Sequence, residues 1–171
     1  KERRYLNRGA AFALAAALDA VRGAGLTREM LAEAGLFVGV GPHLDIGTEF
    51  PHITGGKMER SKVDALWILR FLPNTAASVI AKSCGIRGEN LTVGTACAAA
   101  LSAVGEAFRR IRYGYLDCAL AGGGDSRAYP GGILAYKTAG ALFRGEGDPD
   151  KASRPFDENR GGFVSGEGGA F

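Results

Sequence analysis

The sequence predicts an α/β fold in which short buried strands alternate with helices in packed layers. Residues 36–41 (LFVGVG) and 117–125 (DCALAGGGD) have the apolar character of buried strands. Helical patterns of apolar residues stand between them, and such alternation favours α/β layers. The chain of 171 residues holds 27 glycines without a period and only 6 prolines, which excludes collagen-like chains. Glycines within apolar segments indicate close backbone approach in a tightly packed core.

Two helices are predicted in the first half of the chain. Over residues 5–22, apolar side chains recur at helical spacing, and Gly23 follows as a stop signal. A second helix is expected over residues 74–84, with Asn74 as its N-cap and Gly85 as its stop. These helices supply the alternation with strands on which the α/β prediction depends.

Residues 42–72 are predicted to form loops with one short helix around residues 63–69. Pro42, Pro51 and two consecutive glycines interrupt the pattern of apolar residues there. We interpret this stretch as a surface excursion or a lid.

The second half is predicted to hold a strand at 91–94, a sharp turn, and a helix from about Cys97 to Tyr113. Leu101 is expected on a buried face of that helix. The strand at 117–125 follows, and the final GGFVSGEGGAF is expected to form a pair of strands. No repeat or linker interrupts the sequence, so we expect residues 1–171 to form a single partial domain.

The composition excludes several classes of protein. The formal net charge of +3 does not indicate nucleic-acid binding, although it suits an acidic protein partner. The chain has three cysteines, Cys84, Cys97 and Cys118. An odd number without CxxC spacing disfavours a disulfide scaffold or a zinc site. A reducing, cytoplasmic location is therefore expected. No apolar run is long enough to span a bilayer.

Cys97 lies at the predicted strand-to-helix turn, within a run without charge from Leu91 to Gly105. A helix N-terminus presents unpaired N–H groups and a positive dipole end, which stabilise a thiolate. The same N–H groups can bind the oxyanion of a tetrahedral acyl intermediate. Alternatively, Cys97 only fills space, because free cysteine is among the most often buried residue types. The residue pattern alone leaves both interpretations open.

Three separated motifs occur in an order that is typical of one enzyme family. They are FLPNTAASVIAKSCGIRG, TACAAALSAVGEAFRRIRYGYLDCALAGGGD and KASRPFDENRGGFVSGEGGAF, and together with their flanks they cover most of residues 5–171. They resemble the β-ketoacyl-[acyl carrier protein] synthases of the elongating type, which are condensing enzymes of the thiolase fold. The resemblance implies a layered α-β-α-β-α architecture. It also implies that this chain is the N-terminal half, lacking the extreme N-terminus and the C-terminal half.

The resemblance implies a decarboxylative Claisen condensation in fatty-acid or related polyketide synthesis. Cys97 would accept the acyl chain as a thioester and supply one N–H to the oxyanion hole. Malonyl-[acyl carrier protein] would then lose carbon dioxide and attack the acyl group to give 3-oxoacyl-[acyl carrier protein]. No cofactor or metal is expected, because phosphopantetheine arrives on the carrier protein. The family's catalytic histidines belong to the second half, so the segment alone is expected to be inactive.

Three residues are assigned to the substrate site through the resemblance. Tyr136 aligns with an aromatic residue near the nucleophile and the acyl channel, although a packed core tyrosine explains it equally well. Pro42 and His43 stand where relatives have small or branched apolar channel residues, and an ordinary loop histidine is the alternative for His43. Asp125 and Glu167 are interpreted as capping or ion-pair residues rather than as a catalytic pair.

Lys137 and Arg144 are expected to dock the acidic carrier protein, in place of an arginine that the family often has at the position of Gly140. The expected partners are the acyl carrier protein, acyl and malonyl thioesters, and a second copy of the chain in a homodimer joined through the strand at 91–95. Nucleic acid and membranes are not expected. Two alternatives stay open: a non-condensing partner subunit that resembles a chain-length factor, and a specialised ketosynthase of secondary metabolism.

Overall fold

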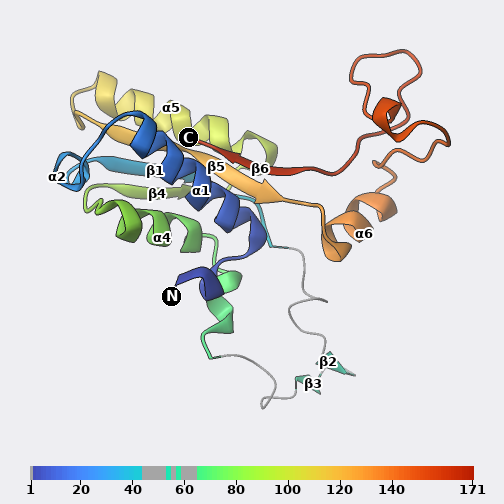
Figure 1. Cartoon of the computed structure of the whole chain (residues 1–171), viewed down its shortest axis with the longest axis horizontal. Coiled ribbons are helices and arrows are strands. Elements are labelled where there is room, and N and C mark those ends of the chain that lie inside the picture. Colours follow the sequence, from blue (N-terminus) through green and yellow to red (C-terminus); the bar gives the residue numbers. More distant parts are fainter. Residues whose placement is uncertain (1, 44–52, 55–56, 59–64) are drawn as a thin grey trace. The chain divides into compact units, whose positions relative to one another are not determined.

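The computed structural model describes residues 2–43, 53–54, 57–58 and 65–171 (Figure 1). The chain divides into two compact units. The first unit comprises Lys1–His43, Val63–Asp125 and Gly168–Phe171, and the second comprises Leu44–Lys62 and Ser126–Glu167. None of the helices in the described ranges is long and apolar enough to cross a bilayer.

A four-stranded sheet in the order β4-β1-β5-β6 forms the centre of the first unit. Its strands are β1 (Gly35–Gly39), β4 (Asn90–Val93), β5 (Ala119–Ser126) and β6 (Glu167–Ala170). Strand β1 runs parallel to both β4 and β5, and Phe37 lies opposite Leu91 on one side and Ala121 on the other. The carboxyl ends of these three strands therefore meet at one edge of the sheet.

Three long helices cover the two faces of this sheet (Figure 1). Helices α1 (Arg8–Gly23) and α4 (Thr75–Cys84) pack on one face, and α5 (Ala99–Arg112) packs on the other. The Asn7 side chain accepts a hydrogen bond from the N–H of Ala10 at 2.9 Å, so α1 starts after Asn7 and not at residue 5 as predicted.

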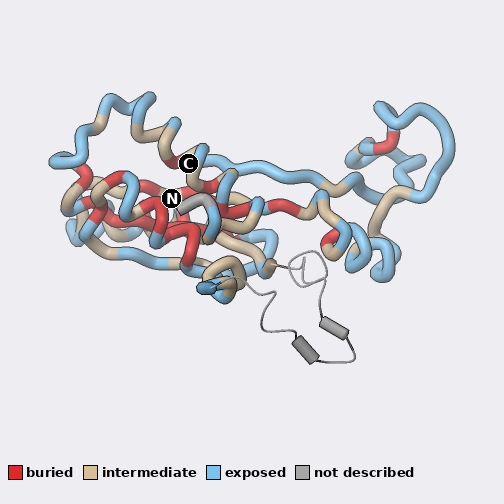
Figure 2. Tube along the Cα trace, turned by 60° about the horizontal axis from the view of Figure 1, so that its bottom comes forward, coloured by how far each residue is buried: buried red, intermediate tan, exposed pale blue. Residues whose placement is uncertain are grey.

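The side chains of β1 alternate between the two layers of helices. Leu36 and Val38 belong to the core under α1 and α4, whereas Phe37 packs against Ala103 and Ala107 of α5. All of β1 is buried. Figure 2 shows that buried segments gather in the part of the chain that contains the main sheet. A strand buried on both faces explains why LFVGVG is continuously apolar.

Helix α5 approaches the sheet through its alanines, and this arrangement corrects the prediction for Leu101. The buried residues of α5 are Ala99, Ala103 and Ala107, which recur every four positions on one helical face. Leu101 is 78% exposed, and an apolar stripe of Leu101, Val104, Phe108 and Ile111 faces outward on the described chain. The prediction was wrong because it assumed that the largest apolar side chains of the helix face the sheet.

Several short elements connect the main ones. These are η1 (Glu2–Tyr5), α2 (Arg28–Leu31), β2 (Ile53–Thr54), β3 (Lys57–Met58), η3 (Trp67–Arg70), η4 (Ala96–Ala98), α6 (Pro130–Thr138) and η5 (Pro149–Lys151). Strands β2 and β3 pair with each other in antiparallel fashion. The short helix expected around 63–69 is the 3-10 helix η3, and most of the rest of 42–72 lies outside the described residues.

Two further predictions need adjustment in detail. Asn74 does occupy the N-cap of α4, but its side chain makes no capping hydrogen bond; Gly85 ends the helix in the left-handed region, as predicted. The expected terminal strand pair is wrong. Within the described tail, β6 joins the main sheet beside β5, and Phe163 makes only an isolated bridge with Leu142.

The described part of the second unit is held together locally. Its backbone links Phe143 and Phe163 through an N–H···O bond of 3.0 Å, beside the bridge from Leu142. Ser126, which is buried, donates a hydrogen bond to the Glu167 carboxylate at 2.8 Å. Ser126 ends β5 and Glu167 begins β6, so this contact joins the two neighbouring strands.

Candidate active site around Cys97

Cys97 lies in the turn between β4 and α5, at the sheet edge where the carboxyl ends of three parallel strands meet. It is the middle residue of η4 and its side chain is exposed. Ala96, immediately before it, has a φ of 51°, in the left-handed region that is unfavourable for an L-residue with a Cβ. The chain thus turns sharply just before the cysteine and presents its thiol at the surface.

The backbone N–H of Cys97 is available to a ligand. Thr95 occupies the N-cap of η4, but its side chain makes no capping hydrogen bond. The N–H of Ala98 bonds to the carbonyl of Thr95 at 3.2 Å. Among the described residues, by contrast, no acceptor is found for the N–H of Cys97. An unpaired donor beside a thiol is the arrangement that an oxyanion hole requires.

A pocket of about 420 Å³ opens beside the thiol, entirely within the first unit. Apart from Val40, Cys97 and Asp125, its walls consist of glycine and alanine: Gly39, Gly41, Ala96, Ala99, Ala100, Gly123, Gly124, Gly168, Gly169 and Ala170. Because few side chains fill this space, a bulky acyl group can approach the sulfur. The size is in the range of small-molecule sites.

The glycines of this pocket are required by the packing around it. A Cβ added to Gly39 would lie 2.3 Å from the backbone N of Ala100, at the start of α5. A Cβ on Gly124 would lie 2.6 Å from the backbone N of Ala13 in α1. Both positions bring a helix backbone directly against the sheet. The sequence predicted close packing at these glycines but not that they line the site. Their position at the ends of apolar strands was the signal that could have placed them there.

None of the predicted substrate residues Pro42, His43 and Tyr136 lines the Cys97 pocket. Gly41 lines the Cys97 pocket, whereas Pro42 and His43 are not among its lining residues. The His43 ring contacts Phe71 edge-on, with ring centroids 4.9 Å apart. In the second unit, Tyr136 contacts Phe163 in a T-shaped arrangement at 5.0 Å, which is typical of a packed aromatic pair.

Lys137 and Arg144 lie together in the second unit. The Arg144 guanidinium donates a hydrogen bond to the carbonyl of Lys137 at 2.9 Å, and both side chains line a pocket of about 590 Å³. The other lining residues are Leu134, Thr138, Leu142 and Phe143. Gly140 follows α6 with a φ of 72°, a conformation that an arginine would adopt only with strain.

The other two cysteines do not share the environment of Cys97. Cys84 is 3% exposed in the core, and burial raises the pKa of its thiol. Cys118 is half-buried beside the same core. Within the described ranges no group of three or more His, Cys, Asp or Glu residues is placed to hold a metal ion.

An exposed cysteine, an N–H without an acceptor among the described residues and a pocket walled by small residues meet at this turn, and nucleophilic catalysis by a thiol needs these features. The family model for "Beta-ketoacyl synthase, N-terminal domain" matches residues 1–171. The chain therefore belongs to the β-ketoacyl synthase family, and its α/β sheet with flanking helices is the N-terminal half of the thiolase-like fold.

Individual relatives agree with this assignment. The chain is 37% identical over 98% of its length to the putative polyketide beta-ketoacyl synthase 1 of Streptomyces halstedii. It is 33% identical over 98% of its length to 3-oxoacyl-[acyl-carrier-protein] synthase 2 of Vibrio harveyi. A ketosynthase solved in complex with its type II polyketide acyl-carrier protein matches with a TM-score of 0.79 at 28% identity, over 96% of this chain. The chain spans only 42%, 41% and 41% of these three proteins, respectively.

Proposed function

We propose that this chain is the nucleophile-bearing half of an elongating β-ketoacyl synthase. The Cys97 thiolate attacks the carbonyl of an acyl thioester, and the carrier's thiol leaves. Malonyl-[acyl carrier protein] then loses carbon dioxide, and the resulting carbanion attacks the acyl-cysteine. The Cys97 thiolate is expelled and 3-oxoacyl-[acyl carrier protein] is formed.

The observation that carries this proposal is the exposed thiol of Cys97 in a pocket walled mostly by glycine and alanine, beside a Cys97 N–H that has no acceptor among the described residues. When the thiol attacks, negative charge develops on the carbonyl oxygen, and the N–H of Cys97 can donate to it. A cysteine that only fills space would be buried, as Cys84 is.

The direct test uses the full-length protein with an acyl-carrier thioester and malonyl-[acyl carrier protein]. We expect mass spectrometry to detect a 3-oxoacyl-[acyl carrier protein] two carbons longer than the acyl donor. Cys97→Ala should abolish this product, whereas Cys84→Ala should retain it. A full-length wild-type protein that forms no product with any acyl length would refute the proposal.

The half described here is proposed to be inactive alone. The stripe of Leu101, Val104, Phe108 and Ile111 leaves a large apolar surface exposed on the described chain, and such patches mark sites where other protein packs. The relatives are more than twice as long as this chain. Decarboxylation of a malonyl thioester by residues 1–171 in isolation would contradict this part of the proposal.

The full protein is proposed to act as a homodimer joined through β4. This strand stands at one edge of the described sheet, and Asn90 and Leu91 are exposed on it. An edge strand presents unpaired N–H and C=O groups to a second strand. Replacing Thr92 with proline would remove one such donor, and we expect sedimentation to show monomers; an unchanged dimer would contradict pairing through β4.

Lys137 and Arg144 are proposed to bind the acidic acyl carrier protein. Two cations border a hollow with apolar walls, which suits a partner that carries both acidic and apolar side chains. We expect the double variant Lys137→Glu/Arg144→Glu to raise KM for acyl-carrier thioesters and to leave kcat with a short pantetheine thioester unchanged. The double variant Arg22→Glu/Arg87→Glu, at two exposed positions of the first unit, changes the net charge by the same amount and is the matched control. An equal increase in KM for this control would show that net charge alone, and not the position of the two cations, sets the affinity for the carrier protein.

A further inference from the structure

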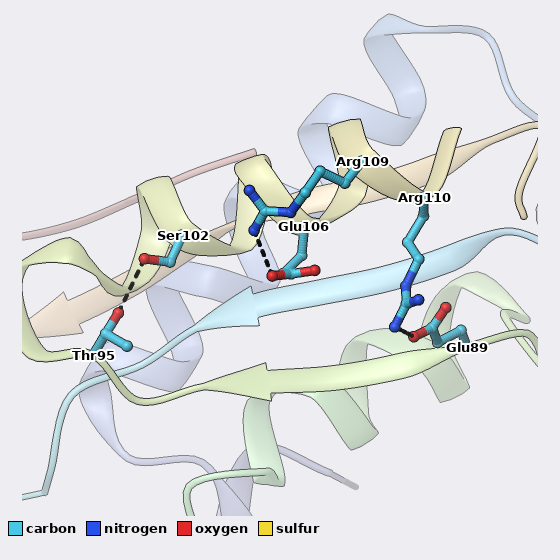
Figure 3. A network of polar contacts seen from close by, with 6 residues as sticks. All are labelled: Glu89, Thr95, Ser102, Glu106, Arg109 and Arg110. Atoms are coloured by element: carbon cyan, nitrogen blue, oxygen red, sulfur yellow. Dashed lines mark hydrogen bonds and ion pairs between the residues drawn. The ribbon is translucent and has the colours of Figure 1, made fainter. Parts of the chain in front are cut away.

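The hydroxyl groups of Thr95 and Ser102 form a hydrogen bond that bridges the turn holding Cys97 (Figure 3). Thr95 Oγ1 donates to Ser102 Oγ at 3.2 Å. Thr95 precedes η4, and Ser102 lies one turn into α5. Their hydrogen bond therefore spans the turn that contains Ala96, Cys97 and Ala98. The two side chains point toward one another across the start of the helix in Figure 3.

The bond with Ser102 engages a side chain that would otherwise cap the helix. A threonine at an N-cap commonly uses its hydroxyl to accept a hydrogen bond from the N–H two or three residues further on. For Thr95 these are the N–H groups of Cys97 and Ala98. The backbone of such a cap is extended, whereas Thr95 has a ψ of 38°, so its hydroxyl reaches them only after a rotation about ψ. The N–H of Ala98 already bonds to the Thr95 carbonyl. A hydroxyl released from Ser102 would therefore compete for the N–H of Cys97.

We infer that Ser102 is a positioning residue that holds the Thr95 hydroxyl away from the Cys97 N–H. This inference rests on the proposed function, in which that N–H stabilises the oxyanion. With Ser102 in place, the donor stays free for the substrate, as it is in the structure. Ser102 itself touches neither the thiol nor the N–H; it acts through Thr95.

The rest of α5 is anchored independently of this pair. Arg110 lies near the C-terminal end of α5, and Glu89 immediately precedes β4. Their side chains form an ion pair at 2.8 Å (Figure 3). Ala103 and Ala107 pack against Phe37 in the sheet. Removing one hydroxyl at position 102 should therefore leave the helix in place and release only the Thr95 side chain.

The test measures the rate of acyl transfer from an acyl-carrier thioester to Cys97 in the full-length protein, by rapid quench and mass spectrometry. We expect Ser102→Ala to slow acylation about tenfold. This effect is smaller than the roughly 10²–10³-fold loss that follows removal of an oxyanion-hole donor, because the Thr95 hydroxyl only competes for the Cys97 N–H and does not remove it. Thr95→Val removes both the bond and the competing cap, so its rate should stay within about threefold of wild type. Ser102→Thr keeps a hydroxyl and should behave like wild type.

The double variant Thr95→Val/Ser102→Ala decides between positioning and simple support of the fold. If Ser102 acts by restraining the Thr95 hydroxyl, the double variant should recover the rate of Thr95→Val alone. A control is Ser78→Ala on α4, which also removes one hydroxyl hydrogen bond, to the Asn74 carbonyl at 2.9 Å. Its acylation rate should match that of wild type, and thermal unfolding should be alike for all variants.

Three results would overturn the inference. Ser102→Ala could acylate as fast as wild type, the double variant could be as slow as Ser102→Ala, or Ser102→Ala could unfold at a clearly lower temperature than Ser78→Ala. The last two would show that the hydroxyl pair supports the fold. Failure of the proposed function is a distinct outcome, because wild type itself would then form no acyl adduct on Cys97.

Discussion

Replacing Gly39 with alanine tests how the sheet positions the nucleophile. The added Cβ would lie 2.3–2.5 Å from three backbone atoms, the N and Cα of Ala100 and the carbonyl C of Ala99. Carbon atoms in contact normally stay about 3.5–4.0 Å apart, so the start of α5 must retreat by about 1 Å. Overpacking of this kind typically costs about 1–3 kcal/mol of unfolding free energy. Displacement of a reacting group by about 1 Å can slow a reaction about 10²-fold.

Urea unfolding and Cys97 acylation in the full-length protein measure these two effects. Gly23→Ala is the matched control, because a Cβ there meets nothing within 4 Å and Gly23 is the last residue of α1. We expect Gly39→Ala to lose both stability and acylation rate, and Gly23→Ala to lose neither. If the two variants behave alike, the close approach of α5 to β1 does not position Cys97.

Three further predictions concern α5 and the thiols. In the 171-residue chain, Leu101→Asp should change the unfolding free energy by no more than about 0.5 kcal/mol because Leu101 is exposed. Ala103→Asp, at a fully buried position, should cost several kcal/mol in urea unfolding; equal losses would contradict the orientation of the helix. A hydrogen bond from the Arg109 side chain lowers the pKa of Glu106. The ionised Glu106 carboxylate therefore stabilises the fold above the ordinary glutamate pKa, and this contribution is lost as the pH falls through the lowered pKa. Glu106→Gln should therefore lower the thermal midpoint near pH 7 but not at about pH 2, and an equal drop at both would be evidence against this. Iodoacetamide should modify Cys97 before Cys84, whose pKa burial raises; peptide mass spectrometry showing the opposite order would refute the assignment of the exposed thiol.

The elements with strong local signals could be predicted from the sequence. The strand at 36–41 is β1, and Gly85 ends α4 in the left-handed region because glycine has no Cβ to clash there. The start of α1 differed by three residues because the Asn7 cap overrides the apolar pattern that begins at Leu6. Element ends depend on such single hydrogen bonds, which periodicity does not report.

The orientation of α5 and the pairing of β6 depend on tertiary packing, and the sequence pattern did not predict them. Large apolar residues were expected to face the sheet, but α5 turns Ala99, Ala103 and Ala107 inward because Gly39 admits its backbone so closely. The paired strands expected in the tail failed for a related reason: β6 finds its partner in β5, more than forty residues earlier in the chain. Neither pairing leaves a local trace in the sequence.

The site was predicted in part. Cys97 at a strand-to-helix turn was identified from the sequence, and the structure places it exposed in η4, just before α5. The hydroxyl bond from Thr95 to Ser102 was not foreseen, because two small polar residues seven positions apart carry no recognisable pattern. The roles of Pro42, His43, Tyr136, Lys137 and Arg144 stay predictions.

The most direct measurement is the mass of the peptide that contains Cys97 after the full-length protein meets an acyl-carrier thioester. We expect this peptide to gain the mass of the acyl group, and hydroxylamine, which cleaves thioesters, to remove it. Peptides that contain Cys84 or Cys118 should stay unmodified. An unacylated Cys97, or acyl groups spread over all three cysteines, would contradict the claim that the β4–α5 turn builds a nucleophile, and would favour a non-condensing partner subunit.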